Sequence, residues 1–357
     1  MNKALSERKR VCVLFGGVSP EHEVSLSTAT SILKNIDRSL FEVLPVAISK
    51  EGKWFLYNGE VSNIIDGTWI NSDKLYPAIL SPSRGDGLLV RYGEELIKER
   101  IDCVFPALHG ENGEDGSIQG LCRVAGIPCV GAMVAASAVS MDKTLTKAIV
   151  KELGIRQARY EICSRNDLLS GFDSISSRVE SSLGYPVFVK PSSTGSSVGI
   201  TKVKTASELK DAVTIALRYS DKALIEEYVD GREVEVAVLG NSSPEASVCG
   251  EIVPGDEFYS YDDKYINGVA TLHIPAELSD GTSDTLRRYA CDIYTAIGCA
   301  GLSRVDFFVD RETEEICFNE INTLPGFTPI SMYPKLWDYC GIPYPELLTR
   351  LIELAME

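Results

Sequence analysis

The chain has 357 residues, more than the roughly 100 to 200 of a typical single domain, so two or three packed units are expected. It carries 35 Lys and Arg against 51 Asp and Glu, and a surface with a formal net charge of −16 repels phosphate backbones and anionic lipid. Hydrophobic residues make up 44% and charged residues 24%, which is typical of a globular protein with a buried core. The composition therefore argues against partners that are nucleic acids or membranes.

Cysteine and apolar patterns indicate the compartment. The ten cysteines form no CxxC pair and only three histidines accompany them, so a zinc site is not predicted. The cysteines are instead predicted to be buried thiols of a protein in a reducing compartment. Gly16-Gly17 ends the apolar run at Val11–Phe15 too early for a signal peptide. No apolar run approaches the roughly 18 residues that a membrane span needs. We therefore expect a cytoplasmic protein.

The first part of the chain alternates strands and helices. The predicted elements are strands at 11–15, 43–48 and 103–106 and helices at 20–36 and 118–125. This order predicts an α/β domain with a parallel sheet flanked by helices, ending near residue 136. The segment 58–87 is rich in Ser, Pro, Gly and Asn and lacks periodicity, so it is predicted to be a loop.

The remainder also mixes strands with helices. The predicted elements are a helix at 141–153 with Ser140 as N-cap, strands at 186–190, 200–203, 223–228, 233–239 and 249–253, a helix at 286–297, strands at 303–309 and 315–321, and a helix at 345–355. Between them, residues 254–270 form a 17-residue stretch with four aromatic side chains. A loop this long is typical of a lid over an active site, and the aromatic residues argue against a linker.

The hairpin at 303–321 carries the most specific signal. Alternation places Arg304, Asp306 and Phe308 on one face, and a turn centred on Thr313 places Asp306 opposite Glu320. Like charges about 5 Å apart across a ladder destabilise it, so a bound cation is the simplest explanation. With Asn322, the two carboxylates form an all-oxygen set suited to Mg²⁺. The alternative is a solvent-facing hairpin with scattered charges.

Two lysines indicate a polyanion. Lys143 lies in the first turn of a predicted helix, where a cation opposes the helix dipole unless an anion is near. Lys190 ends a strand beside the loop PSSTGSSVG, whose Gly195 and Gly199 allow backbone N–H groups to approach phosphate oxygens. In an acidic protein a nucleotide is the simplest such anion. The alternative is an ordinary flexible loop.

His109 and Glu21 each follow a predicted strand. In α/β sheets ligands bind at the carboxyl ends of strands, so both are candidate site residues. Taken singly, an acidic residue at a helix start is more often a dipole partner, and a lone histidine is more often structural. Their common placement favours a binding role.

Taken together, these motifs resemble the D-alanine:D-alanine ligases of the ATP-grasp superfamily over nearly the whole chain. The segments that carry the resemblance are LFGGVSPEHEVS at 14–25, LHG at 108–110, GEDG at 113–116, MDK at 141–143, GSSVG at 195–199, the lid around 258–265, SRVD at 303–306 and NEINTLPGF at 319–327.

The resemblance implies an ATP-grasp fold with an N-terminal parallel-sheet domain at 1–137, a central subdomain at 138–225 and a C-terminal catalytic domain at 226–357, whose lid is the loop 254–270. It implies a ligase for peptidoglycan precursors that phosphorylates one D-alanine with ATP and joins it to a second. Two Mg²⁺ ions are implied, with Mn²⁺ as an alternative metal, and a homodimer is the default assembly.

The resemblance also implies roles for individual residues. The ATP-binding residues are Lys143, Lys190, Ser197, Glu226, Glu233 and Lys264, and the metal ligands are Asp306, Glu320 and Asn322. The catalytic residues are Glu21, Ser196, Tyr265, Arg304 and Gly326. The substrate-binding residues are Glu21, His109, Ser331 and Met332.

Relatives join D-alanine, D-serine or D-lactate as the second substrate, and two clues favour D-alanine, with D-serine as the alternative. The lid pair Lys264-Tyr265 resembles the dipeptide-forming type, and Met332 differs from the arginine of D-serine-type relatives. Ile330 stands where many relatives have a histidine. A third possibility, of another class, is an ATP-binding module of this fold that has lost turnover.

Overall fold

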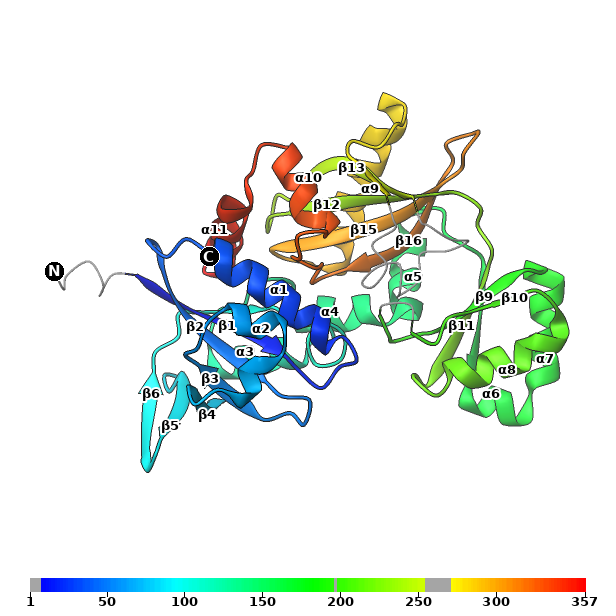
Figure 1. The fold of residues 1–357 in the computed structure, drawn as a ribbon. Helices are drawn as coiled ribbons and strands as arrows, with labels where there is room; N and C mark the ends of the chain where they lie inside the picture. The colour runs from blue at the N-terminus through cyan, green and yellow to red at the C-terminus, as the bar shows by residue number, and fades with distance from the viewer. Residues whose placement is uncertain (1–7, 196–197, 254–270) are drawn as a thin grey trace.

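The computed structural model describes residues 8–195, 198–253 and 271–357. Its strands form three sheets, of seven, four and five strands in chain order. In Figure 1 the first sheet lies at the lower left, the second at the right, and the third above and between them. Within the described ranges, no helix is both long enough and apolar enough to span a membrane.

The N-terminal sheet is parallel only in part. Its strands, in spatial order, are β6 (Glu95–Glu99), β5 (Leu88–Tyr92), β4 (Leu75–Leu80), β3 (Trp54–Tyr57), β2 (Phe41–Ile48), β1 (Lys9–Gly16) and β7 (Cys103–Pro106). Strand β1 pairs in parallel with β2 and β7, as predicted, whereas β2 to β6 pair antiparallel. The connections from β2 to β3, from β4 to β5 and from β5 to β6 are too short for a parallel pair, which needs a crossover of a dozen residues or more.

The prediction of a loop at 58–87 is wrong. This segment contains α2 (Ser62–Ile65), a 3₁₀ helix η2 (Thr68–Asn71) and strand β4. Each element is too short to show a hydrophobic period. Trp69 anchors the segment, because its ring is buried and packs edge-on against Phe15 at 5.8 Å between centroids.

Helices cover both faces of the parallel strands. They are α1 (His22–Asn35) and α3 (Ser117–Ala125), whereas Ala136 of α4 (Val134–Met141) belongs to the core of the C-terminal sheet. Alternate side chains of β1 belong to different cores: Val13 and Phe15 lie in the same cluster as side chains of α1, and Leu14 in the same cluster as side chains of α3. The period of two in a strand thus explains why β1 is apolar at every position from Val11 to Phe15.

The central unit has a core of its own. Its sheet has the order β10 (Thr201–Val203), β9 (Val187–Pro191), β11 (Lys222–Glu227), β8 (Tyr160–Ser164), with helices α6 (Arg165–Ser170), α7 (Phe172–Arg178), η3 (Val179–Leu183) and α8 (Ala206–Ala216). The predicted hairpin around the Ser/Gly loop is confirmed, with Thr201 paired to Val189.

The helix α5 (Lys143–Glu152) precedes this unit, and its predicted N-cap was wrong. Asp142, not Ser140, is the N-cap, and its carboxylate accepts the backbone N–H of Thr144 at 2.9 Å. Residue 142 is extended and interrupts the helical pattern, so Ser140 belongs to the preceding helix α4. Lys143 is therefore the first residue of α5.

The C-terminal sheet has the order β14 (Thr271–His273), β13 (Glu245–Val253), β12 (Arg232–Leu239), β15 (Leu302–Val309), β16 (Ile316–Asn322). It packs against α9 (Asp280–Ile297) and α10 (Met332–Tyr339), and α11 (Tyr344–Ala355) closes the chain. One hydrophobic cluster joins β1 and α1 to α10 and α11, and the Tyr344 hydroxyl donates to Ser31 at 3.1 Å. The N-terminal and C-terminal units are thus tied together, whereas the central core is separate.

Candidate active site

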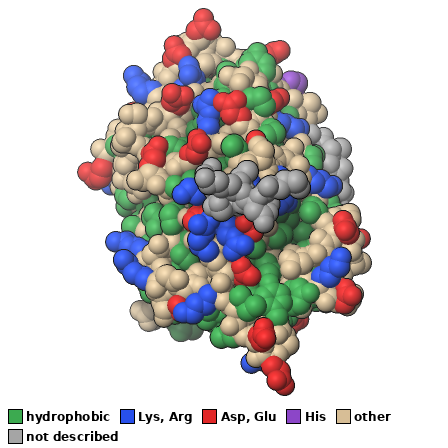
Figure 2. Space-filling model, turned by 90° about the vertical axis from the view of Figure 1, so that its left-hand side faces the viewer, with side chains coloured by type: hydrophobic (Ala, Val, Ile, Leu, Met, Phe, Trp, Pro, Cys, Tyr) green, Lys and Arg blue, Asp and Glu red, His purple; other side chains and the backbone are tan. Residues whose placement is uncertain are grey.

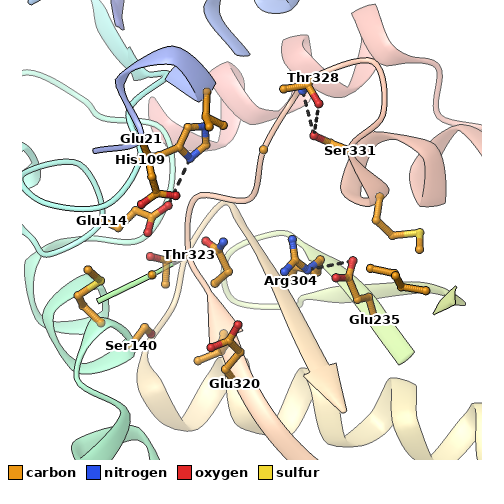
Figure 3. Close-up of a pocket in the computed structure, with 18 of the residues that line it drawn as sticks. Glu21, His109, Glu114, Ser140, Glu235, Arg304, Glu320, Thr323, Thr328 and Ser331 are labelled. Carbon is orange, nitrogen blue, oxygen red and sulfur yellow. Dashed lines mark hydrogen bonds and ion pairs between the residues drawn. The ribbon is translucent and has the colours of Figure 1, made fainter. Parts of the chain in front are cut away.

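Two adjoining cavities lie where the three units meet. The larger, of about 430 Å³, is lined by residues from all three (Figure 3), and the smaller, of about 210 Å³, lies between the central and C-terminal sheets. Lys143, Gly195 and Glu320 line both cavities, so the two are connected there. Lys and Arg side chains gather near the middle of the face in Figure 2, with acidic side chains among them.

One corner of the larger cavity is formed by the N-terminal unit. Glu21 precedes α1 and is buried, and His109 follows β7, so the two predicted residues are brought together. His109 contacts Glu114 Oε1 through Nδ1 at 3.4 Å and Thr28 Oγ1 through Nε2 at 2.9 Å. Gly110 has φ +66°, and a Cβ there would come within 2.5 Å of Glu21 Oε2, so the backbone must lack a side chain at this point.

The charge of His109 follows from this corner. Burial lowers the pKa of His109, but its hydrogen bond to Glu114 and the charges of Glu114 and Glu21 outweigh burial, so the pKa lies above its usual value. Glu114 was missed as a site residue, although it belongs to the GEDG segment. The sequence offered one indication of Glu114: it is an acidic residue five positions after the candidate His109, within a turn that brings the two side chains together.

The two predicted lysines line the smaller cavity. Lys143 donates to the Thr194 carbonyl at 2.7 Å and lies 3.8 Å from Glu320 Oε2. Lys190 is largely buried and its Nζ lies 2.6 Å from Glu226 Oε2. Burial lowers the pKa of Lys190, but the charge of Glu226 outweighs it and the pKa is raised. Lys143 therefore stands at the junction of the cavities, and Lys190 lines the smaller one.

Part of the predicted site lies outside the described residues. These positions are Ser196 and Ser197 of the Ser/Gly loop, and Lys264 and Tyr265 with the rest of the predicted lid at 254–270. Gly195 is described and lies against the N-terminal corner, because a Cβ built there would be 3.5 Å from Glu21 Oε2. The Ser/Gly loop thus reaches from the central unit to Glu21.

The hairpin of β15 and β16 has the predicted register at its charged residues. Asp306 pairs with Glu320 across β15 and β16, and Arg304 pairs with Asn322. An irregularity after Asp306 then shifts the register by one, so that Phe308 pairs with Cys317. The simple alternation predicted as far as the turn is therefore wrong beyond Asp306. The shift brings Phe307 opposite Phe318, and these rings pack edge-on in the core.

Arg304 is a largely buried cation that lines the larger cavity. Its Nε and Nη2 donate to the two oxygens of Asp306 at 2.8 and 2.7 Å, and Nε lies 3.0 Å from Glu235 Oε2. Burial lowers the pKa of Arg304, but the two carboxylates outweigh it and the pKa is raised. Glu235 was missed by the sequence reasoning. It lies two residues after Glu233 on β12 and pairs with Asp306 across the ladder, so strand alternation was an available signal.

The hairpin residues fit a divalent cation. A carboxylate has about four acceptor sites, so Asp306 can accept from Arg304 and still offer lone pairs to a metal. Glu320 is half-exposed toward both cavities, and the side-chain oxygen of Asn322 accepts the Leu324 N–H at 2.9 Å, which orients the amide. The three side chains supply only oxygen ligands, which suits Mg²⁺ with substrate phosphates completing its shell.

The far end of the larger cavity is formed by the start of α10. Ser331 is its N-cap residue, and Ser331 Oγ accepts the Thr328 N–H at 3.0 Å (Figure 3). Gly326 approaches the same hydroxyl, because a Cβ there would lie 2.9 Å from Ser331 Oγ. Met332 lines the cavity and is buried. The predicted residues Gly326, Ser331 and Met332 are thus gathered at one end.

Comparison with known proteins shows the family. Residues 10–132 match the family model described as D-ala D-ala ligase N-terminus, and residues 149–353 match the model described as D-ala D-ala ligase C-terminus. The chain belongs to the D-alanine–D-alanine ligase family. The fold is the ATP-grasp fold of this family, whose members use ATP and a divalent metal.

Relatives of this family are similar over their full length. A D-alanine–D-alanine ligase of Acetivibrio thermocellus is 48% identical over 99% of this chain and 97% of its own, and one of Clostridium acetobutylicum is 46% identical over 98% of each. Among solved structures, the VanG D-Ala:D-Ser ligase of Enterococcus faecalis superposes with a TM-score of 0.88 at 37% identity, covering 98% of this chain and 99% of that one. The D-alanine-D-alanine ligase of Coxiella burnetii gives 0.84 at 35%, covering 98% and 94%.

Proposed function

We propose that the chain is an ATP-dependent ligase that joins two D-alanine molecules through a D-alanyl phosphate, in the cytoplasm, for peptidoglycan precursors. The observation that carries the proposal is the junction of the two cavities. There Lys143 and the carboxylate Glu320 stand between the Glu21 corner and the smaller cavity, which Lys190 and Glu226 line. A polyphosphate with its metal would therefore lie next to an amino-acid site.

The smaller cavity suits a nucleotide. Phe188, Phe308 and Phe318 supply apolar walls for a planar base, and Glu226 and Glu233 line the same cavity. We assign Glu226 to adenine and Glu233 to ribose, on the resemblance of their positions to the family motif. Lys143 and Lys190 would contact the phosphates, together with Ser197 and Lys264.

Asp306, Glu320 and Asn322 would hold the divalent metal, as two Mg²⁺ ions or as Mn²⁺. The metal would supply charge neutralisation between the phosphate oxygens. Lys143 lies 3.8 Å from Glu320 and can therefore contribute positive charge to the same region. Arg304 fixes Asp306 by two hydrogen bonds, which orients that carboxylate before any ligand binds.

The Glu21 corner would receive the first amino acid. The Glu21 carboxylate would bind its ammonium group, and His109, fixed by Glu114 and Thr28, would support it. Ser196 and Tyr265 would join Glu21 in a network that closes the site. Closure would protect an acyl phosphate from water.

The reaction has two steps. A carboxylate oxygen of the first D-alanine attacks the γ-phosphorus of ATP, which forms D-alanyl phosphate and releases ADP. The amine of the second D-alanine then attacks the acyl carbon, loses a proton, and phosphate leaves. Arg304 and the backbone N–H of Gly326 would stabilise the oxyanion of the tetrahedral intermediate. Ser331 at the start of α10 would receive the carboxylate of the second amino acid.

The second substrate has two candidates. Similarity to a solved D-Ala:D-Ser ligase at 37% identity favours D-serine, whereas the buried apolar side chain of Met332 and relatives at 46 to 48% identity favour D-alanine. We propose D-alanine, because an apolar wall offers no partner to a serine hydroxyl. Incubation with ATP, Mg²⁺ and equal D-alanine and D-serine, followed by mass measurement of the product, decides between them. A mixed dipeptide as main product would contradict the proposal.

We also propose that the protein forms a homodimer, on its resemblance to the family.

A further inference from the structure

A second lysine of α5 lies behind the nucleotide cavity and has no role in the steps above. Lys147 is one turn after Lys143, and its side chain is 1% exposed. It lines neither cavity. Its Nζ lies 2.6 Å from Glu226 Oε1 and 5.3 Å from the ring centroid of Tyr160. A fully buried ammonium is costly unless it is paired, so Glu226 is what compensates Lys147.

Glu226 is shared between two lysines. Oε1 faces Lys147 and Oε2 faces Lys190, each at 2.6 Å. Burial raises the pKa of Glu226, but the charges of Lys190 and Lys147 outweigh burial, and the pKa falls to about 2. The carboxylate is therefore held from two sides, and Lys190 alone of the two cations reaches the cavity.

The charge balance of this trio depends on Lys147. Two lysines and one glutamate leave one net positive charge, and that charge stands at the cavity on Lys190. Without Lys147, Glu226 and Lys190 would form a neutral pair, and Glu226 would hold Lys190 away from any phosphate. Glu226 would also lose the contact that fixes the direction of its carboxylate.

We propose that Lys147 is a positioning residue for the nucleotide: it neutralises and orients Glu226 from behind, so that Lys190 keeps its positive charge for the nucleotide phosphates. The inference rests on the proposed function, because it takes ATP as the occupant of the smaller cavity. Lys147 acts through Glu226 and does not touch the nucleotide.

The test is a comparison of Lys147→Gln with Lys147→Arg. Glutamine keeps a donor for Glu226 but removes the charge, and arginine keeps the charge. We expect Lys147→Gln to weaken Mg-ADP binding by calorimetry, and to raise the KM for ATP, by about tenfold or more, with kcat changed less than about threefold. Lys147→Arg should restore most of the affinity. Folded Lys147→Gln with wild-type Mg-ADP affinity would overturn the proposal, whatever its thermal stability.

If Lys147→Gln alone does not fold, the same substitution can be tested in a protein that already carries Glu226→Gln. In Glu226→Gln there is no carboxylate for Lys147 to neutralise, so adding Lys147→Gln should cost less than about twofold in Mg-ADP affinity. A further tenfold loss would contradict action through Glu226. Binding of Mg-ADP needs no D-alanine, so wild-type protein that binds no nucleotide would refute the proposed function itself, whereas unchanged affinity in the variants refutes only the role of Lys147.

Discussion

Asp306 stands directly opposite Glu320 in the antiparallel ladder of β15 and β16. Two carboxylates in this relation repel each other, by roughly 0.2 to 1 kcal/mol on the scale of cross-strand pairs. Glu320 lines both cavities, and a cation held between the two carboxylates and the substrate phosphates would explain why the pair persists there. Removing one charge of this pair should therefore lower turnover without lowering the free energy of unfolding.

We expect Glu320→Gln to lose turnover by at least about a hundredfold while the free energy of unfolding stays equal or rises slightly, because one metal ligand and one repulsion are removed together. Phosphate release and thermal unfolding measure the two effects. The matched control is Glu312→Gln at the exposed turn of the same hairpin. Unchanged turnover in Glu320→Gln would exclude Glu320 from the metal site.

Arg304 should act on the rate more than on nucleotide binding. Arg304→Lys keeps a positive charge between Glu235 and Asp306 but loses the fork that binds both oxygens of Asp306. We expect kcat to fall by about 10² to 10³, as for loss of an oxyanion donor, with the KM for ATP within about threefold. Steady-state kinetics separate the two, and a rise in KM with unchanged kcat would contradict the oxyanion role.

His109 predicts a pH dependence of stability. Its pKa is raised above 6.5 in the folded chain by Glu114 and Glu21 against burial, so its contribution is fully present below pH 6.5 and is lost as pH rises through the folded pKa. The difference in free energy of unfolding between wild type and His109→Gln should therefore shrink as the pH rises above 6.5. Denaturant titrations across this range measure it, and a difference that does not vary with pH would show that folding does not raise the pKa of His109.

Lys335 makes a prediction about the second amino acid. It lines the larger cavity one turn after Ser331, and no ion pair is found for it in the described part of the chain. An unpaired cation at this end attracts a carboxylate. We expect Lys335→Met to raise the KM for the second D-alanine several-fold with the KM for ATP unchanged. Lys335→Arg keeps the positive charge and should have a KM for the second D-alanine close to that of the wild type. A KM for D-alanine equal to wild type in Lys335→Met would contradict it.

Residues that share a strand were predictable, and residues that meet through loops were less so. The Asp306–Glu320 pairing followed from alternation alone, because the period of a strand is fixed. The register beyond Asp306 was not predictable, since the one-residue shift there is set by the packing of Phe307 against Phe318. The strand β4 was missed for a similar reason, as its place depends on neighbours in the sheet.

The charged partners Glu114, Glu235 and Lys147 also escaped the sequence reasoning. Glu235 compensates Arg304 and Lys147 compensates Glu226, each from another strand or helix, and Glu114 compensates His109 within the loop between β7 and α3. The GEDG segment that contains Glu114 and the strand alternation that includes Glu235 do not show which charge each residue balances. Only the three-dimensional arrangement shows which charge each one balances.

The most direct test of the proposed reaction is to measure whether oxygen is transferred from the D-alanine carboxylate to the released phosphate. D-Alanine labelled with ¹⁸O in its carboxylate is incubated with ATP and Mg²⁺, and the released phosphate and the dipeptide are weighed by mass spectrometry. Because a carboxylate oxygen attacks the γ-phosphorus and stays there when the amine displaces phosphate, the account predicts one ¹⁸O in each phosphate and D-alanyl-D-alanine as product. Phosphate released without ¹⁸O, or no D-alanine-dependent release, would contradict it.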